Sequence, residues 1–143
     1  MLALIGDQKG GLTVWDPRQG DHPAHAATLH PGGVLSGIRG IPGTPYVTTC
    51  GADNRILVLD PRKNYSPVHE FKDHTDFIYS LEVLGPLVLS GAGNGWLLVH
   101  DALTGKCCYG LGANTAAVRV IYADPTLLFA AGDDGNASVY DYV

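Results

Sequence analysis

The sequence predicts an all-β fold: a partial β-propeller of about 3.5 four-stranded antiparallel blades that form an open arc. The main observation is a repeat that ends in Asp, at intervals of about 40–45 residues, which is the length of one propeller blade. The four endings are Trp15-Asp16, Leu59-Asp60, His100-Asp101 and Tyr140-Asp141. A turn residue lies seven positions before each Asp: Lys9, Asp53, Asn94 and Asp134. A Gly lies just upstream of each of these turn residues.

The repeats divide the 143-residue chain into units of about 1–29, 30–71, 72–110 and 111–143. The first unit begins at the second of the four strands of a blade, at residues 2–5, and continues with strands at 12–15 and near 26–29. The second unit has four predicted strands, at 34–38, 46–50, 55–59 and 67–71. Between its middle strands, Asp53-Asn54 suits a turn with positive φ. Asp60-Pro61 then predicts the turn into the outer strand.

The last two units repeat this order of strands. The third has predicted strands at 77–83, 87–90, 96–99 and 106–109, and the fourth at 118–122, 127–131 and 137–140. A closed propeller often ends after the third strand of a blade, because its N-terminal strand completes that blade. A start at the second strand is not typical. We therefore expect an authentic C-terminus and a ring that lacks its N-terminal part.

Composition excludes several classes of function. The net charge is −5 and no run of Lys or Arg occurs, so we expect no nucleic-acid partner. No apolar run approaches 18 residues, so we expect no membrane span. The three cysteines, Cys50, Cys107 and Cys108, are an odd number without a C-x-x-C spacing, which favours a reduced intracellular setting, cytoplasmic or nuclear.

Sequence motifs for catalysis or cofactor binding are weak. His22 and His25 have the spacing of a metal pair but no supporting cluster beyond Asp21, so we expect no metal there. The glycine-rich segment 91–95 lies between two strands, which leaves no helix N-terminus for a phosphate. Cys107 and Cys108 are expected to alternate between the two faces of an outer strand, without a base nearby. We expect no enzyme activity and no cofactor.

The four repeats resemble the WD40 family over essentially the whole chain. Segments 95–105, 108–114 and 131–135 are also similar to the C-terminal part of F-box/WD-repeat proteins. In such proteins an F-box recruits the Skp1–cullin core of a ubiquitin ligase, and the propeller presents a protein or peptide substrate. No F-box lies in these residues, so the resemblance implies a substrate-facing domain without the ligase attachment.

The resemblance also implies a structural set of polar residues in each blade. A His before the first strand bonds a Ser or Thr on the second strand, the Asp of the following turn and the Trp of the third strand. The expected sets are His30, Cys50, Asp53 and Leu59; His74, Ser90, Asn94 and His100; and Asn114, Ala131, Asp134 and Tyr140. No set is complete, so we expect the blades to be held mainly by apolar packing. Trp15, Asp16, Asp60, Asp101 and Asp141 have the same structural character.

The predicted binding surface is the rim formed by the loops before the first strand and by the turns after the second strand of each blade. Loops on a rigid scaffold are where binding residues concentrate. Phe77 is a large apolar side chain there and either anchors a partner or packs under a neighbouring loop. The other candidates are Thr75, Asp76, Asp133 and two arginines that could pair with an anion, Arg55 and Arg119.

We therefore expect a non-catalytic protein-interaction module, part of the substrate-recognition propeller of an SCF-type ubiquitin ligase. The alternative is a general WD40 scaffold unrelated to ubiquitination. A histone-peptide reader would need a larger acidic or aromatic cage than Asp76, Phe77 and Asp133 supply. A propeller enzyme would need converging acids or metal ligands in the channel.

Overall fold

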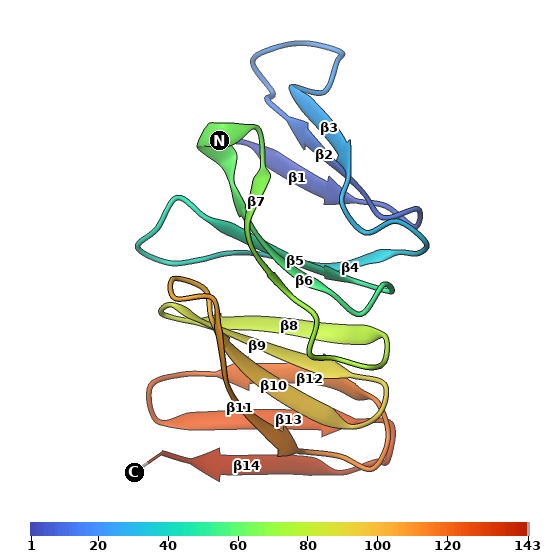
Figure 1. Cartoon of the computed structure of the whole chain (residues 1–143), viewed down its shortest axis with the longest axis vertical. Helices are drawn as coiled ribbons and strands as arrows, with labels where there is room; N and C mark the ends of the chain where they lie inside the picture. The colour runs from blue at the N-terminus through green and yellow to red at the C-terminus, as the bar shows by residue number, and fades with distance from the viewer. Residues whose placement is uncertain (143) are drawn as a thin grey trace.

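The computed structural model describes residues 1–142 and confirms the all-β partial propeller (Figure 1). Its strands form four antiparallel sheets that follow one another along the long axis, from the N-terminal sheet to the C-terminal one. The sheets are β1 (Ala3–Gly6), β2 (Gly11–Trp15) and β3 (His25–Thr28); β4 (Leu35–Gly40), β5 (Val47–Gly51), β6 (Ile56–Asp60) and β7 (Ser66–Phe71); β8 (Ile78–Leu84), β9 (Leu87–Ala92), β10 (Trp96–Asp101) and β11 (Lys106–Gly112); and β12 (Val118–Ala123), β13 (Leu127–Gly132) and β14 (Ala137–Asp141). The one helical segment in this part of the chain is a 3-10 turn, Pro61–Lys63.

Each sheet is an up-and-down meander in which consecutive strands are hydrogen-bonded neighbours. We call β4, β8 and β12 the inner strands, because each begins its sheet and contacts the inner strand of a neighbouring sheet. The predicted strands lie within a few residues of the observed ones. The turns β1–β2, β5–β6, β9–β10 and β13–β14 each have a residue with positive φ at the same place in the repeat: Gly10, Asn54, Gly95 and Gly135.

The turns into the outer strands of the first two sheets are stabilised by the same hydrogen bonds between an Asp and an Arg two residues later. The carboxylate of Asp60 accepts hydrogen bonds from the backbone N–H of Arg62 and, at two points, from its guanidinium. Asp16 holds Arg18 in the same way, and these bonds lower the pKa of Asp16 to about 2. The Asp-Pro-Arg sequence therefore closes two turns with one geometry.

Three apolar clusters lie between successive sheets. Leu12 packs with Leu59 between the first and second sheets, and Ile56 packs with Ile78 between the second and third. Leu97 and Leu128 belong to the cluster between the third and fourth sheets. Hydroxyl groups add bonds between inner strands: Ser36 Oγ donates to the carbonyl of Ile78 (2.5 Å), and Ser80 Oγ donates to that of Val118 (2.8 Å).

The outer face of the fourth sheet is apolar and exposed. Its residues are 37–60% exposed and come from all three strands: Val120, Tyr122, Phe129 and Val139. In the strand register, Phe129 and Val139 occupy the places that Leu89 and Val99 occupy in the third sheet, where they pack against the next sheet. The fourth sheet thus presents the surface that the other sheets use for contact. No helix in the described residues is long and apolar enough to cross a membrane.

Candidate functional site

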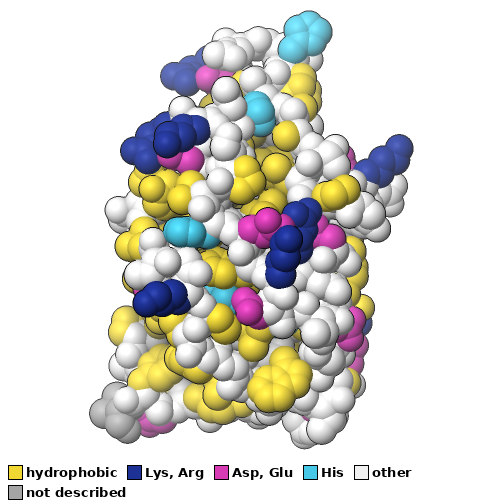
Figure 2. All heavy atoms as spheres, in the orientation of Figure 1, with side chains coloured by type: hydrophobic (Ala, Val, Ile, Leu, Met, Phe, Trp, Pro, Cys, Tyr) yellow, Lys and Arg dark blue, Asp and Glu magenta, His cyan; other side chains and the backbone are white. Residues whose placement is uncertain are grey.

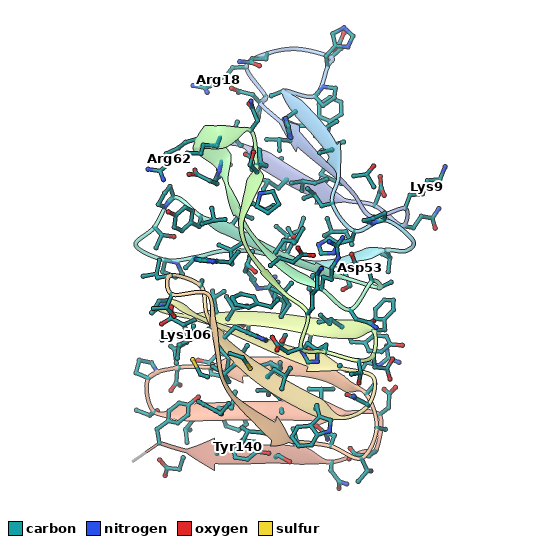
Figure 3. All side chains as sticks on the ribbon, in the orientation of Figure 1. Lys9, Arg18, Asp53, Arg62, Lys106 and Tyr140 are labelled. Atoms are coloured by element: carbon teal, nitrogen blue, oxygen red, sulfur yellow. The ribbon has the colours of Figure 1, made fainter. Side chains whose placement is uncertain are left out.

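The turns and loops predicted to bind a partner lie together at one rim of the stacked sheets. Figure 3 shows Lys9 and Asp53 on this side, and Arg18, Arg62 and Lys106 on the opposite side. We call the first side the candidate rim. It carries the turns after the second strands and the loops before the inner strands. On the face drawn in Figure 2, Lys and Arg side chains are scattered and do not form one continuous field.

A β-bulge near the start of each inner strand brings three side chains to this rim. The strand register shifts between Leu35 and Gly37, between Ile78 and Ser80, and between Val118 and Val120. The intervening bulge residues are Ser36, Tyr79 and Arg119. A bulge kinks its strand and redirects the local side chain. The same irregularity in three sheets therefore aligns three different side chains.

Aromatic and charged side chains form a stacked column across the third and fourth sheets. The ring of Phe77 lies 4.4 Å from that of Tyr79, centre to centre, and the guanidinium carbon of Arg119 lies 4.1 Å from the centre of the Tyr79 ring. On its other side Arg119 donates to both carboxylate oxygens of Asp133, at 2.9 and 2.7 Å. This pair lowers the pKa of Asp133 and raises that of Arg119. Phe77 is half-buried, and its ring packs against Tyr79 on one side.

A cavity of about 240 Å³ opens beside this column, between the inner strands of three sheets. Its polar lining comes from Ser36, Arg39, Tyr79, Ser80 and Arg119. Arg39 approaches Glu82 of the neighbouring inner strand at 3.8 Å. The cavity therefore offers cationic and hydroxyl groups next to an aromatic surface, a combination suited to a peptide carrying an acidic or hydroxyl side chain.

The other predicted rim residues mainly stabilise the turns. Asp76 accepts a hydrogen bond from the backbone N–H of Phe77 (2.7 Å), and Thr75 is bonded by the Asn94 amide (3.2 Å). Arg55 was expected to be available for an anion, but its guanidinium already bonds Asp53, Glu70 and the carbonyl of Leu29. Because Asp53 and Glu70 both pair with Arg55, this guanidinium stabilises the fold of the second sheet.

The buried polar sets are more connected than the sequence indicated. His30 is fully buried and bonds Thr49 Oγ1 through Nε2 (2.9 Å) and Asp53 through Nδ1 (2.8 Å). The second-strand member is Thr49 and not Cys50, because the register of β5 and β6 aligns Thr49 with Ser90 of the next sheet. By the same register Ala130 replaces Ala131. The prediction was one residue out of phase in two of the three sheets.

The third and fourth sheets contain partial versions of this set. His74 Nε2 bonds Ser90 Oγ at 2.7 Å, and burial, with a smaller effect of His100, lowers the pKa of His74 to about 4. In the fourth sheet the Asn114 amide donates to Asp134 (2.8 Å). The backbone amides of Thr115 and Asn136 and the Asn114 amide lower the pKa of Asp134 to about 2. Polar bonding therefore supplements apolar packing in all three of these sheets.

Sequence reasoning missed two groupings. Tyr79 completes the rim column, and its aromatic character at a bulge position was the available signal. Asp73, His100 and Cys107 come together at the outer part of the third sheet, from segments far apart in the sequence.

Cys107 and Cys108 are both exposed, because the bulge opposite Val99 and His100 breaks the expected alternation. Although Cys107 is exposed as a residue, partial desolvation of its sulfur and the nearby Asp73 carboxylate raise the pKa of the thiol, which is unfavourable for a nucleophile.

The stacked sheets, the shared turns and the histidine–hydroxyl bonds define the fold as a partial WD40 β-propeller. The chain is 24% identical to nuclear distribution protein PAC1 of Arthroderma otae, over 91% of this chain and 31% of that protein. The chain has the same identity and coverage with nuclear distribution protein PAC1 of Arthroderma benhamiae and of Trichophyton verrucosum. The chain thus spans about a third of the length of the curated relatives it matches. No family model matches it.

Solved structures share the fold at low sequence identity. The computationally designed Ika4 protein superposes with a TM-score of 0.87 and 19% identity, over 98% of this chain and 84% of that one. A chain of the mitotic checkpoint complex superposes with a TM-score of 0.86 and 17% identity, over 99% of this chain and 45% of that one. These likenesses establish the propeller architecture.

Proposed function

We propose that this chain is a non-catalytic protein-interaction module that binds a protein or peptide at the candidate rim. The observation that carries the proposal is the column of Phe77, Tyr79, Arg119 and Asp133 beside the cavity between the inner strands. Aromatic residues and Arg dominate the energetic centres of protein interfaces. Here they are held by strands and bulges, so little ordering entropy is lost on binding.

We further propose that the module is the C-terminal part of a substrate-recognition propeller in an SCF-type ubiquitin ligase. Support comes from the similarity of segments 95–105, 108–114 and 131–135 to the C-terminal part of F-box/WD-repeat protein 9. Contact with the Skp1–cullin core would then require an F-box outside these residues. The alternative is a general WD40 scaffold unrelated to ubiquitination, and the likeness to PAC1 proteins favours that alternative.

The test is capture of partners by the full-length natural protein with Arg119→Ala. Arg62→Ala is a matched control, because Arg62 also lies over a Tyr ring, that of Tyr46, and pairs with an Asp at the opposite rim. Partners lost with Arg119→Ala and kept with Arg62→Ala would support binding at the candidate rim. Equal loss or equal retention in the two variants would contradict it. Co-capture of Skp1 by the unmodified protein separates the ligase proposal from the scaffold alternative.

A further inference from the structure

A second grouping of polar side chains lies at the outer part of the third sheet. It contains Asp73 from the segment between β7 and β8, His100 from β10 and Cys107 from β11. Oδ2 of Asp73 lies 2.9 Å from Nε2 of His100. His100 and Cys107 are cross-strand partners, and one potential ligand atom from each of the three residues lies within 4.8 Å of the others.

We infer that Asp73, His100 and Cys107 form a binding site for a zinc-like divalent cation. Carboxylate oxygen, imidazole nitrogen and thiolate sulfur are all common zinc ligands. The charges of one carboxylate and one thiolate together neutralise a dication. The thiolate and the imidazole favour zinc or cobalt over magnesium or calcium, which prefer oxygen ligands.

The three ligand atoms lie close enough together to reach one cation. Zinc bonds of about 2.0–2.3 Å place neighbouring ligand atoms roughly 3.3–3.7 Å apart. The Asp73–His100 distance of 2.9 Å is shorter than this range, and the three ligand atoms lie within 4.8 Å of one another. Coordination would therefore require only small side-chain movements by Asp73 and Cys107, both of which are exposed. A water molecule would complete four-fold coordination.

His100 is the fixed ligand of the three. Its side chain is fully buried, and its ring lies 4.3 Å from that of Phe71, centre to centre. Nε2 faces Asp73, whereas Nδ1 has no hydrogen-bond partner among the residues described. The contact with Asp73 is thus the polar anchor of this buried ring. A cation at Nε2 would take the place of the proton shared with Asp73. It would also link the segment between β7 and β8 to β10 and β11.

The test is a Co²⁺ titration of the reduced 143-residue chain, followed by absorbance. We expect one Co²⁺ per chain with a thiolate-to-cobalt charge-transfer band in the near ultraviolet. Cys107→Ser abolishes the band, and Cys108→Ser, the matched control on the same strand, keeps it. Asp73→Asn weakens Co²⁺ affinity by roughly tenfold or more.

A second readout uses Zn²⁺ and thermal unfolding at constant protein concentration. A cation that binds only the folded chain raises the unfolding temperature, so we expect a rise for the unaltered chain and for Cys108→Ser. Cys107→Ser, checked for a native strand signal by circular dichroism, should show no rise. Absence of the band and of the thermal shift in the unaltered chain would overturn the inference. So would a Cys107→Ser variant that titrates like the unaltered chain.

Discussion

The guanidinium of Arg119 lies over the ring of Tyr79, so the bulge residues of two adjacent inner strands are in direct contact. Cation–π contacts of this kind contribute about 0.5–1 kcal/mol at exposed sites. The pair also fixes the direction of the Arg119 guanidinium, because Asp133 binds it from the other side. The rim is therefore ordered before any partner arrives.

Phe77→Ala should weaken partner binding more than it weakens folding. An aromatic anchor at the centre of an interface contributes roughly 2 kcal/mol or more, which is about 30-fold in affinity. Tyr109→Ala is a control, because Tyr109 is an exposed aromatic residue on the outer strand β11. Affinity per folded molecule and melting temperature are both measured in the full-length protein. A fall of many degrees with unchanged affinity would make Phe77 a packing residue.

Acidification should destabilise the fold between about pH 6.5 and pH 4. Burial holds the folded pKa of His74 at about 4, below its usual value of 6.5, so the unfolded chain binds its proton first. The stability from neutral His74 is complete above pH 6.5 and is lost as the pH falls towards 4, by roughly 3 kcal/mol. Burial lowers the pKa values of His30 and His100 in the same direction.

Urea unfolding midpoints at several pH values measure this effect. His74→Leu should reduce the pH dependence across that window relative to the unaltered chain. An unchanged slope in His74→Leu would mean that folding does not lower the pKa of His74.

Gly95→Ala should be far more destabilising than Gly135→Ala. Both glycines have positive φ, so both substitutions incur a backbone cost of about 1–2 kcal/mol. At Gly95 the new Cβ would also overlap the carbonyl oxygen of Asn114, whereas nothing lies within 4 Å at Gly135. We expect a loss of roughly 4 kcal/mol or more for Gly95→Ala. Similar unfolding midpoints for the two variants would show that the turn adjusts freely.

The isolated chain of residues 1–143 should self-associate. The face with Tyr122, Phe129 and Val139 is apolar and exposed, and β14 is the edge strand of its sheet. Such surfaces promote association between chains. Sedimentation velocity should show oligomers that Val139→Lys shifts towards monomer, while Val68→Lys on the outer strand β7 does not. A compact monomer with slow amide exchange in β14 would contradict this expectation.

Local sequence signals predicted the strands well and the side-chain sets less well. The spacing of the Asp residues and the turn residues defines each hairpin, so β5 and β6 were placed to within a residue. Side-chain partners depend on the strand register and on bulges, because both decide which residue of one strand lies opposite a given residue of the next. Thr49 was missed in favour of Cys50 for that reason. The proximity of Asp73, His100 and Cys107 depends on packing between segments more than 25 positions apart, for which no local pattern exists.

The bonds from Ser36 to Ile78 and from Ser80 to Val118 end on main-chain carbonyls. Every residue type provides such an acceptor, so these joints do not constrain the side chain of the residue that accepts. Surface loops beside the joints can therefore change sequence while the spacing of the sheets is preserved. Ser36 and Ser80, which make these joints, also line the cavity at the candidate rim, so changes in the loops would leave this shared lining in place.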